Sequence, residues 1–335
     1  MKAAQISSPG SDFVLTERAL PEPGPGAVRV KVAACGICHS DAFAKEGHWP
    51  NLVYPRVPGH EVAGTIDALG PGIAGWAPGD RVGIGWCGSY CGRCGPCRSG
   101  DFIACSQLAI TGLHIDGGYQ QYMIAPATGL ARIPAALGFA EAAPLLCAGV
   151  TTFNSLRHSR ALPGELVAVH GIGGLGHLGI QFARQFGFQV AAISRGRDKE
   201  ELALRLGAHR YIDAAAANPA EELTRLGGAR VILATAPHSA AISQLIGGLG
   251  RNGMLLAIAG TADPLTVSPA QLIGRRLSIQ GWPSGSPQDS EDTLNFCALT
   301  GVRPMIEEFP LEEAGRAYQR MIANQARFRA VLVNR

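Results

Sequence analysis

A short apolar segment followed by a glycine-rich turn constrains the fold of this chain more than any other feature. Leu166–His170 is typical of a short buried strand, and a helical pattern runs to Phe186 after Gly171, Gly173 and Gly176. In such a turn the first glycine allows the sharp bend, the second lets a pyrophosphate approach the backbone, and the third lets helix and strand pack closely. The alternative is a glycine-rich turn without a ligand, but the strand before it and the helix after it favour dinucleotide binding. The residues expected to line this site are Gly171, Gly173, Gly174, Leu175 and Gly176.

Strands and helices continue to alternate after this turn. The expected strands are Gln189–Ser194, Val231–Ala234 and Met254–Ala259, with Leu277–Gly281 as a candidate for a further strand; the expected helices are Lys199–Leu206 and Ala240–Leu249. This alternation predicts a parallel sheet with right-handed crossovers, that is, a doubly wound α/β domain of the Rossmann type.

The first 150 residues have a different texture. They are rich in glycine and proline, and turn signals such as Pro78-Gly79-Asp80 separate short β-type runs such as Val28–Val32 and Glu61–Asp67. This pattern predicts an irregular, mostly β domain. The C-terminal tail adds an amphipathic helix around Glu312–Ile322 and a terminal strand at Ala330–Val333.

Bulk properties exclude several classes of protein. A chain of 335 residues suggests two domains. The formal charge is +3 and the basic residues are scattered, so the sequence indicates no basic surface for binding nucleic acid or a membrane. Met1–Val14 lacks the apolar stretch of a signal peptide and no run is long enough to span a bilayer, so we expect a cytoplasmic protein. Nine cysteines in a reducing compartment indicate metal binding or catalysis rather than disulfides.

Four cysteines form a compact metal-binding pattern. Cys91, Cys94, Cys97 and Cys105 follow a C-x2-C-x2-C-x7-C pattern, and glycines lie between them. A tight loop of this kind can wrap four thiolates around one zinc ion, and four protein ligands leave no open position for chemistry. An iron–sulfur cluster is the competing interpretation. We therefore expect a structural metal site, with zinc favoured.

Further zinc-type ligands are dispersed along the chain. Cys38 lies in Cys35-Gly36-Ile37-Cys38, His60 and Glu61 are adjacent, and Cys147 follows much later. Each has an ordinary alternative as a buried structural residue, and the spacing alone does not bring them together.

The motifs as a set resemble the medium-chain zinc-dependent alcohol dehydrogenases over essentially the whole chain. The motifs that carry the resemblance are Cys38-His39-Ser40-Asp41, Gly59-His60-Glu61, the four-cysteine loop, Leu146-Cys147-Ala148-Gly149 and Gly171–His177. The resemblance implies a GroES-like catalytic domain at 1–149, completed by 288–335, and a dinucleotide-binding domain at 150–287. It also implies a catalytic zinc held by Cys38, His60 and Cys147, with water, substrate or Glu61 in the remaining position, and hence two zinc ions per chain.

The same resemblance implies roles for the neighbouring residues. Asp41 would orient the ring of His60, as metal-bound histidines generally require. Ser40 would take the proton from the substrate oxygen, His39 would lie near the pyrophosphate, and Thr151 would touch the nicotinamide. The terminal base of the proton relay stays open between His39, Glu46 and His48. Cys35, Cys87 and Cys297 match no ligand position and are expected to be packing residues.

Two aromatic residues and one basic segment bear on specificity. Trp49 and Trp86 match positions that narrow the pocket in relatives acting on small primary alcohols, although ordinary core packing is an alternative. At the end of the second expected strand, where an acidic residue would hold the adenine ribose, the chain has Ser194 and Arg195, with Lys199 close behind. An arginine there can accommodate a 2′-phosphate, which favours NADP(H) over NAD(H); the alternative is a solvated surface loop whose field Asp198 weakens.

These observations together predict an oxidoreductase that moves a hydride between a small primary alcohol, aliphatic or aromatic, or its aldehyde, and NADP(H). Alternatives are a polyol- or secondary-alcohol dehydrogenase of the same superfamily, an NAD-dependent enzyme, and a non-enzymatic dinucleotide-binding protein. The resemblance makes a homodimer or homotetramer the expected assembly. The bulky segment Trp282-Pro283-Ser284-Gly285 has no functional interpretation from the sequence.

Overall fold

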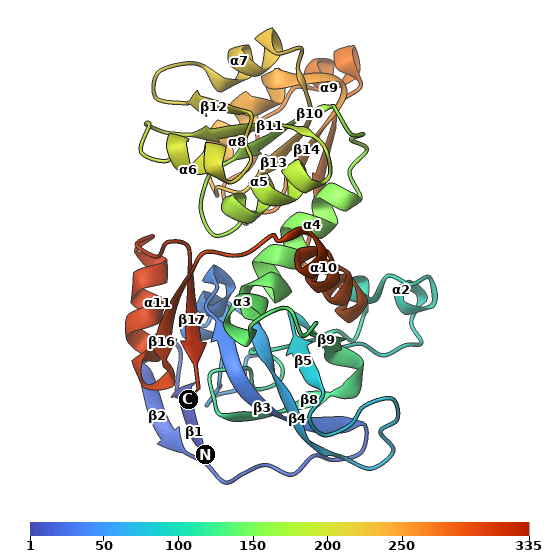
Figure 1. The fold of residues 1–335 in the computed structure, drawn as a ribbon, viewed down its shortest axis with the longest axis vertical. Helices are drawn as coiled ribbons and strands as arrows, with labels where there is room; N and C mark the ends of the chain where they lie inside the picture. Colours follow the sequence, from blue (N-terminus) through green and yellow to red (C-terminus); the bar gives the residue numbers. More distant parts are fainter. Residues whose placement is uncertain (335) are drawn as a thin grey trace. The chain divides into compact units, whose positions relative to one another are not determined.

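The computed structural model describes residues 1–334 and divides into two compact units. Unit 1 contains Met1–Val150 together with the C-terminal segment that begins at Ser284, and unit 2 contains Thr151–Pro283 (Figure 1). The predicted fold class is confirmed, because one unit is built on a largely antiparallel sheet and the other on a parallel sheet.

A seven-stranded sheet forms the centre of unit 1. In spatial order its strands are β16 (Ile306–Pro310), β17 (Arg329–Val333), β3 (Ala27–Gly36), β4 (Val62–Leu69), β5 (Arg81–Ile84) and β9 (Leu130–Arg132), and β8 (Tyr122–Pro126) also pairs with β3. Every pairing is antiparallel except that of β16 with β17. Because β17 pairs directly with the end of β3, matching Leu332 with Cys35, the C-terminal segment completes the core of this unit.

Smaller elements surround this sheet. Two-stranded sheets pair β1 (Lys2–Ile6) with β2 (Phe13–Glu17) and β6 (Cys87–Ser89) with β7 (Ala109–Ile110). The helices are α1 (Ala42–Lys45), α2 (Gly95–Arg98), α3 (Phe139–Pro144), α10 (Pro287–Thr300) and α11 (Ala314–Ile322), and a π-helical turn spans Leu145–Gly149. The longest helix, α10, begins at a capping box formed by Ser286 and Asp289 and ends at Gly301, which has a φ of 78°.

Unit 2 is a six-stranded parallel sheet with helices between its strands. The order is β12 (Arg210–Asp213), β11 (Gln189–Ser194), β10 (Leu166–His170), β13 (Ala229–Ala234), β14 (Leu249–Ala257) and β15 (Ser278–Gly281). The helices are α4 (Val150–Arg157, which begins one residue before this unit), α5 (Gly176–Gln185), α6 (Glu200–Arg205), α7 (Pro219–Arg225), α8 (Ser239–Leu245) and α9 (Pro269–Arg275). The chain runs outward from β10 to β12 and then returns to β13, so the order of the strands reverses between β10 and β13. Ligands of such sheets bind at the carboxyl ends of the strands near this reversal.

Element boundaries differ from expectation in a few places. Strand β12 and helices α7 and α9, which are four to seven residues long, were not expected. The helix expected at Ala240–Leu249 ends at Leu245, and β14 begins at Leu249 rather than Met254. Arg251 and Asn252 near the start of this strand are polar and exposed, so the apolar run that predicted the strand begins only after them.

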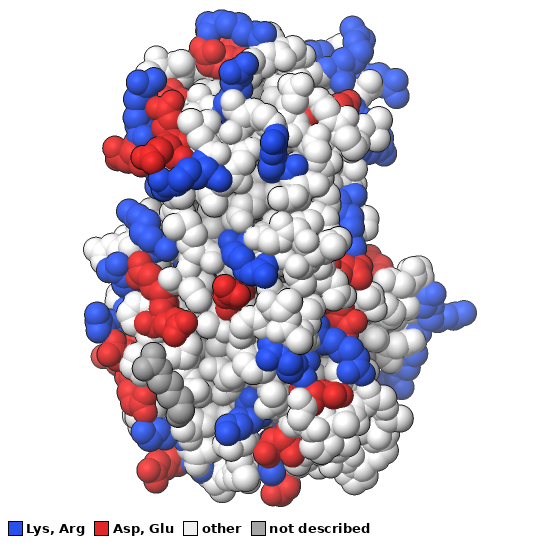
Figure 2. Space-filling view, in the orientation of Figure 1, with Lys and Arg blue, Asp and Glu red and all other residues white. Residues whose placement is uncertain are grey.

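Surface charge is mixed on both units. Figure 2 shows basic and acidic side chains interspersed on the face that it displays, and the formal net charge is only +3. Within residues 1–334, every helix is too short or too polar to cross a lipid bilayer.

The bulky segment after β15 takes part in an aromatic stack. The indole of Trp282 lies against the imidazole of His158, with ring centroids 4.9 Å apart and planes inclined by 18°. His158 follows the end of α4, so the stack joins the two ends of unit 2 where the chain enters and leaves it. This contact is a structural explanation for the size of residue 282.

Candidate active site

The dispersed zinc-type ligands of unit 1 meet at one point. Ligand atoms of Cys38, His60, Glu61 and Cys147 all lie within 4.8 Å of one another, and the two cysteine sulfur atoms are 3.8 Å apart. Their convergence follows from the pairing of β3 with β4. Because Cys35 pairs with Val62, the residues just after β3 lie next to the residues just before β4, at the same end of this strand pair. Cys147 comes from the π-helical turn Leu145–Gly149, a distortion that is frequent at functional sites.

Asp41 organises the next layer of contacts. Its Oδ1 lies 3.0 Å from Nδ1 of His60, and its Oδ2 accepts hydrogen bonds from the backbone N–H of Cys38 at 2.8 Å and the hydroxyl of Tyr119 at 2.7 Å. Since Nδ1 of His60 is engaged by Asp41, Nε2 is the ring nitrogen left for a metal ion. The role expected of Asp41 therefore has a matching contact, while Tyr119 had no distinguishing signal in the sequence.

Glu61 forms a buried ion pair with Arg329, a residue that sequence analysis also missed. A guanidinium nitrogen of Arg329 contacts Oε1 of Glu61 and also lies 3.2 Å from the carbonyl oxygen of Ile37. Both side chains are buried, with relative exposures of 8% and 0%. A single arginine within the apolar strand β17 was the available signal, because a charge at such a position requires a partner.

Electrostatics at this centre are strongly coupled. The hydrogen bond between Cys38 and Cys147 lowers the pKa of Cys38 well below its usual value and raises that of Cys147. Burial alone would lower the pKa of His60, but the charge of Asp41 and their hydrogen bond raise it well above its usual value. Burial raises the pKa of Glu61 to about 7, although Arg329 opposes that effect. Burial and the charge of Asp41 raise the pKa of the Tyr119 phenol, so it remains a donor.

These residues fit a metal ion. Among residues 1–334, Nε2 of His60 and Oε2 of Glu61 are buried side-chain atoms without a hydrogen-bond partner. Buried polar atoms are normally satisfied, so two unsatisfied atoms beside two thiols indicate a missing shared partner. Sulfur, imidazole nitrogen and carboxylate oxygen are the ligand types that zinc takes in proteins, and a bound zinc would displace the thiol protons.

The four cysteines of the compact loop form a second candidate zinc site. Ligand atoms of Cys91, Cys94, Cys97 and Cys105 lie within 4.8 Å of one another around the short helix α2. Backbone N–H groups of Cys91 and Gln107 approach the sulfur of Cys105 at 3.3 Å. Backbone hydrogen bonds lower the pKa of Cys94 to about 6, which favours the thiolate that a metal requires. Cys35, Cys87 and Cys297 are buried and lie outside both clusters.

Of the residues expected to move protons and to shape the pocket, Ser40 lies two residues after Cys38 and Trp86 lies against His60. His39–Asp41 form a 3-10 turn in which Ser40 is half-buried, whereas the side chain of His39 is exposed, as are those of Glu46 and His48. The indole of Trp86 meets the ring of His60 edge-on with centroids 5.0 Å apart, and Trp49 contacts Trp86 at 6.1 Å. The two tryptophans are therefore adjacent and lie beside a proposed metal ligand.

In unit 2 the glycine-rich turn joins β10 to α5, as the sequence predicts. Gly171 has a φ of 92°, and a Cβ on Gly176 would lie 1.8 Å from the carbonyl oxygen of Gly171, so both positions require glycine. A Cβ on Gly173 would meet no atom within 4 Å. The open space above Gly173 fits a pyrophosphate at the N-terminus of α5. Gly174 and Leu175 complete the turn and are half-buried, and Thr151 is buried on α4.

The segment after β11 is held by contacts from β12. Oδ1 of Asp213 accepts hydrogen bonds from the backbone N–H groups of Gly196 at 2.7 Å and Ala215 at 2.8 Å. Lys199 Nζ donates to the carbonyl oxygen of Ile172 at 2.7 Å, which places an ammonium group beside the glycine-rich turn. Ser194 is half-buried and Arg195 is exposed.

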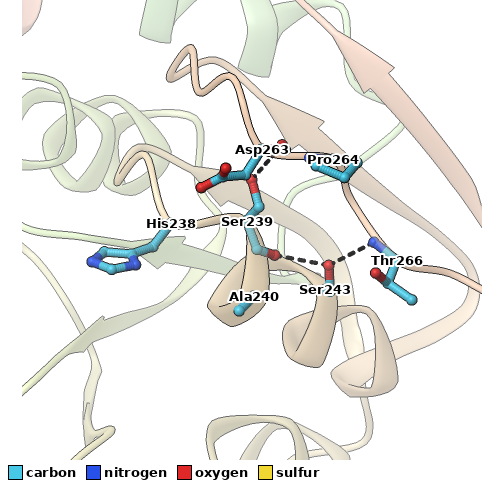
Figure 3. Close-up of a pocket in the computed structure, with 7 residues that line it drawn as sticks. All are labelled: His238, Ser239, Ala240, Ser243, Asp263, Pro264 and Thr266. Atoms are coloured by element: carbon cyan, nitrogen blue, oxygen red, sulfur yellow. Dashed lines mark hydrogen bonds between the residues drawn. The ribbon is translucent and has the colours of Figure 1, made fainter.

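A hollow of about 460 Å³ also lies on unit 2, between the start of α8 and the segment after β14. Its two serine hydroxyls bond within the protein: Ser239 Oγ donates to the carbonyl oxygen of Asp263 at 2.7 Å, and Ser243 Oγ donates to that of Ser239 at 2.8 Å (Figure 3). The two serine hydroxyls are therefore satisfied within the protein, while the side chains of His238, Asp263 and Thr266 also line the hollow.

Comparisons with known proteins agree with this geometry. Residues 24–135 match the alcohol dehydrogenase GroES-like domain, and residues 174–298 match the zinc-binding dehydrogenase family. The chain is 44% identical to alcohol dehydrogenase patD of Penicillium expansum, over 99% of this chain and 97% of that protein. An NAD-dependent alcohol dehydrogenase superposes with a TM-score of 0.92 at 29% identity, covering 100% of both chains. The Helicobacter pylori CAD complexed with NADP(H) gives 0.88 at 25% identity, covering 99% of this chain and 97% of that one.

Two zinc-type ligand clusters and a Rossmann-type sheet in one chain define a zinc-dependent dehydrogenase that uses a nicotinamide dinucleotide. The chain belongs to the medium-chain zinc-dependent alcohol dehydrogenase family, and it is an NAD(P)-dependent enzyme of that family.

Proposed function

We propose that this enzyme interconverts small primary alcohols, aliphatic or aromatic, and their aldehydes, and that it prefers NADP(H). The position of Trp86 carries the substrate part of the proposal, because its indole packs against His60 with centroids 5.0 Å apart. Trp49 extends this wall, and Phe43 meets Trp49 at 5.6 Å. Large rigid side chains beside a metal ligand reduce the volume for substituents on the carbinol carbon. Primary alcohols and planar aromatic substrates suit such a site better than polyols or bulky secondary alcohols.

Residues of unit 1 supply the ligands and the proton pathway. When bound by Cys38, His60 and Cys147, zinc supplies Lewis-acid chemistry that makes the substrate hydroxyl more acidic. The nicotinamide cofactor supplies the hydride acceptor or donor. Ser40 lies in the 3-10 turn that follows Cys38, and we assign its Oγ to receive the proton of the substrate hydroxyl. His39, Glu46 and His48 are exposed candidates for passing that proton to solvent.

The cofactor preference rests on the end of β11. Ser194 stands where NAD-specific sites carry a carboxylate. Such a carboxylate accepts hydrogen bonds from the ribose and repels a 2′-phosphate, and Ser194 has no charge with which to repel that phosphate. The nearest carboxylate in the adjacent strand, that of Asp213, uses Oδ1 to hold two backbone N–H groups. Arg195 is exposed, and its planar fork suits phosphate oxygens. Arg197 lies 3.3 Å from Glu200, so its charge is partly compensated.

A panel of substrates measured with both cofactors tests this function. We expect higher kcat/KM for ethanol, benzyl alcohol and their aldehydes than for sorbitol or 2-butanol, and higher values with NADPH than with NADH. A preference for polyols or secondary alcohols would refute the substrate assignment, and a clear preference for NADH would refute the cofactor assignment. Light scattering on the same sample tests the expected homodimer or homotetramer.

Three variants isolate the determinant of cofactor preference. Arg195→Ala should raise the KM for NADPH by about 10-fold, the value of one charge-assisted contact, and change the KM for NADH little. Ser194→Asp should restore repulsion of the phosphate and shift the preference toward NADH. Arg197→Ala is the matched control, because it removes a neighbouring exposed charge that already has a partner. Equal effects of Arg195→Ala and Arg197→Ala on NADPH would contradict a specific role for Arg195.

A further inference from the structure

A hydrogen-bonded chain continues inward from the proposed zinc ligand His60. His60 Nδ1 lies 3.0 Å from Oδ1 of Asp41, and the hydroxyl of Tyr119 donates to Oδ2 of the same carboxylate at 2.7 Å. The backbone N–H of Cys38 donates to this Oδ2 at 2.8 Å. Three donors therefore share the charge of Asp41, and Tyr119 is the only side chain among them that does not bind the metal in the proposed site.

The position of the Tyr119 ring is tightly fixed. The side chain has a relative exposure of 0%, and its ring packs against that of Phe13, with centroids 5.9 Å apart and planes inclined by 39°. A Cβ on Gly59, the residue before His60, would lie 2.4 Å from the Tyr119 ring. The glycine thus permits close approach of the phenol ring to the backbone beside the ligand. The titratable groups that influence the hydroxyl are Asp41, Cys35 and Glu61.

We propose that Tyr119 is a positioning residue that withdraws charge from Asp41 and thereby sets how strongly His60 binds zinc. The inference rests on the proposed catalytic site at Cys38, His60 and Cys147. A carboxylate behind a metal-bound histidine orients the ring and raises its basicity. A second strong donor on that carboxylate reduces the charge available to the imidazole, because hydrogen bonds in a buried network polarise one another.

The consequence concerns the pH at which alcohol is oxidised. A less basic His60 leaves the metal more electrophilic, so the substrate hydroxyl gives up its proton at lower pH. Without the hydroxyl of Tyr119, Asp41 draws more strongly on the Nδ1 proton of His60, and oxidation requires a higher pH. The effect is electronic, and it does not require a change in the shape of the core.

Tyr119→Phe tests the proposal because it removes only the hydroxyl. We expect two metal ions per chain to be retained and the pH profile of kcat/KM for alcohol oxidation to move to higher pH by about half a unit. With cobalt in place of the catalytic zinc, the visible d–d absorption bands should shift, since they report the field of the ligands directly. Loss of the second metal from the folded variant would contradict the proposal, because removal of the hydroxyl should strengthen the binding of zinc by His60.

Tyr318→Phe is the matched control. Tyr318 lies in the same core and its ring also packs on Phe13, at 5.4 Å, but its hydroxyl is not among the groups that donate to Asp41 in the described chain. This variant should keep the wild-type pH profile and cobalt spectrum. In an Asp41→Asn background, which lacks the charge to be shared, Tyr119→Phe should produce no additional shift.

A second measurement does not depend on how Tyr119→Phe folds. Replacing all tyrosines by 3-fluorotyrosine makes each phenol a stronger donor, so the pH profile should move to lower pH in both the wild type and Tyr318→Phe. Unchanged profiles and unchanged cobalt spectra in Tyr119→Phe and in the labelled protein would overturn the proposal and leave Tyr119 as core packing. A wild-type protein that binds only one metal would overturn the catalytic zinc site itself, which is a distinguishable result.

Discussion

The two units place their functional atoms in opposite ways. In unit 1 the proposed catalytic ligands are side chains far apart in sequence: Cys38 and Cys147 are separated by 109 positions, yet their sulfur atoms lie 3.8 Å apart. In unit 2 the proposed phosphate site is a local stretch of backbone from Gly171 to Gly176, at the end of one strand and the start of one helix. The first site depends on the whole unit being folded, whereas the second depends on whether a few positions lack a side chain.

This difference determines how each site should fail. Removal of a ligand side chain in unit 1 leaves a partly satisfied buried cluster and removes the chemistry. In unit 2 the result of adding a single methyl group depends on the glycine. At Gly176 the methyl group would collide with the backbone, whereas at Gly173 it would enter the space proposed for the ligand. The four-cysteine loop is an intermediate case, because its ligands are side chains but lie within fifteen residues, from Cys91 to Cys105.

The largest expected effect separates the two cysteine clusters of unit 1. Cys38→Ser should reduce kcat by about 10³-fold or more, because Lewis-acid activation is worth several kcal/mol, while much of the fold survives. Cys94→Ser should instead lower the thermal midpoint by about 5–10 °C, because structural zinc contributes to folding free energy. Elemental analysis should give two zinc ions in the wild type and about one in each variant. Equal losses of stability in the two variants would contradict the division into catalytic and structural sites.

A smaller loss of rate is expected at Ser40, which contributes no metal ligand. Ser40→Ala should lower kcat by about 10²-fold, the lower end of what a positioned proton-transfer group contributes. Zinc content and thermal midpoint should stay at wild-type values, which distinguishes this change from Cys38→Ser. Ser40→Thr retains a hydroxyl and should recover most of the rate. Normal kinetics for Ser40→Ala would mean that the residue only forms the turn between Cys38 and Asp41.

The glycines of unit 2 provide the corresponding test for a backbone site. Gly176→Ala should lower stability and cofactor binding together, because its Cβ would lie 1.8 Å from the carbonyl oxygen of Gly171. Gly173→Ala meets no atom within 4 Å, so it should fold normally and yet raise the KM for the cofactor by about 10-fold. Thermal midpoints and cofactor titrations for both variants measure this. Unchanged cofactor binding in Gly173→Ala would place the pyrophosphate elsewhere.

The same contrast explains what the sequence could reveal. Local patterns were sufficient in unit 2, where the strands expected at Leu166–His170 and Gln189–Ser194 have those bounds in the structure. Strand β12 (Arg210–Asp213) was missed because four residues are too few to show a clear alternation of apolar and polar side chains. In unit 1 the spacing of Cys91 to Cys105 predicted a cluster, whereas Cys38, His60 and Cys147 were associated only through the family resemblance.

Partners of the ligands were harder to predict than the ligands. Asp41 was expected behind His60, but Tyr119 donates to it from a distance of 78 positions in the sequence. Arg329 reaches Glu61 because β17 pairs with β3, a contact between opposite ends of the chain. Such pairings are set by the register of the sheet, which the sequence of either segment alone does not specify.

The last expected effect is a pH dependence of stability in unit 2. Burial, and to a lesser extent His238, lowers the pKa of His170 to about 4 in the folded protein, against about 6.5 in an unfolded chain. Between these values the unfolded chain binds more protons, so stability falls as the pH decreases from about 6.5 to about 4, by at most about 3 kcal/mol. Cysteine ligands in unit 1 also protonate in acid, so a global unfolding curve would mix the two units.

Hydrogen exchange of amides in β10 and β13 isolates the contribution of unit 2. Protection of these amides, corrected for the intrinsic effect of pH on exchange, should decline between pH 6.5 and 4. His170→Gln does not titrate in this range, so its decline should be shallower than that of the wild type. The absolute stability of the variant at pH 7 does not affect this comparison, because the quantity tested is the slope with pH. Identical slopes in the two proteins would show that His170 is as easily protonated in the folded state as in the unfolded chain, although its Nδ1 is buried without a hydrogen-bond partner at the end of β10.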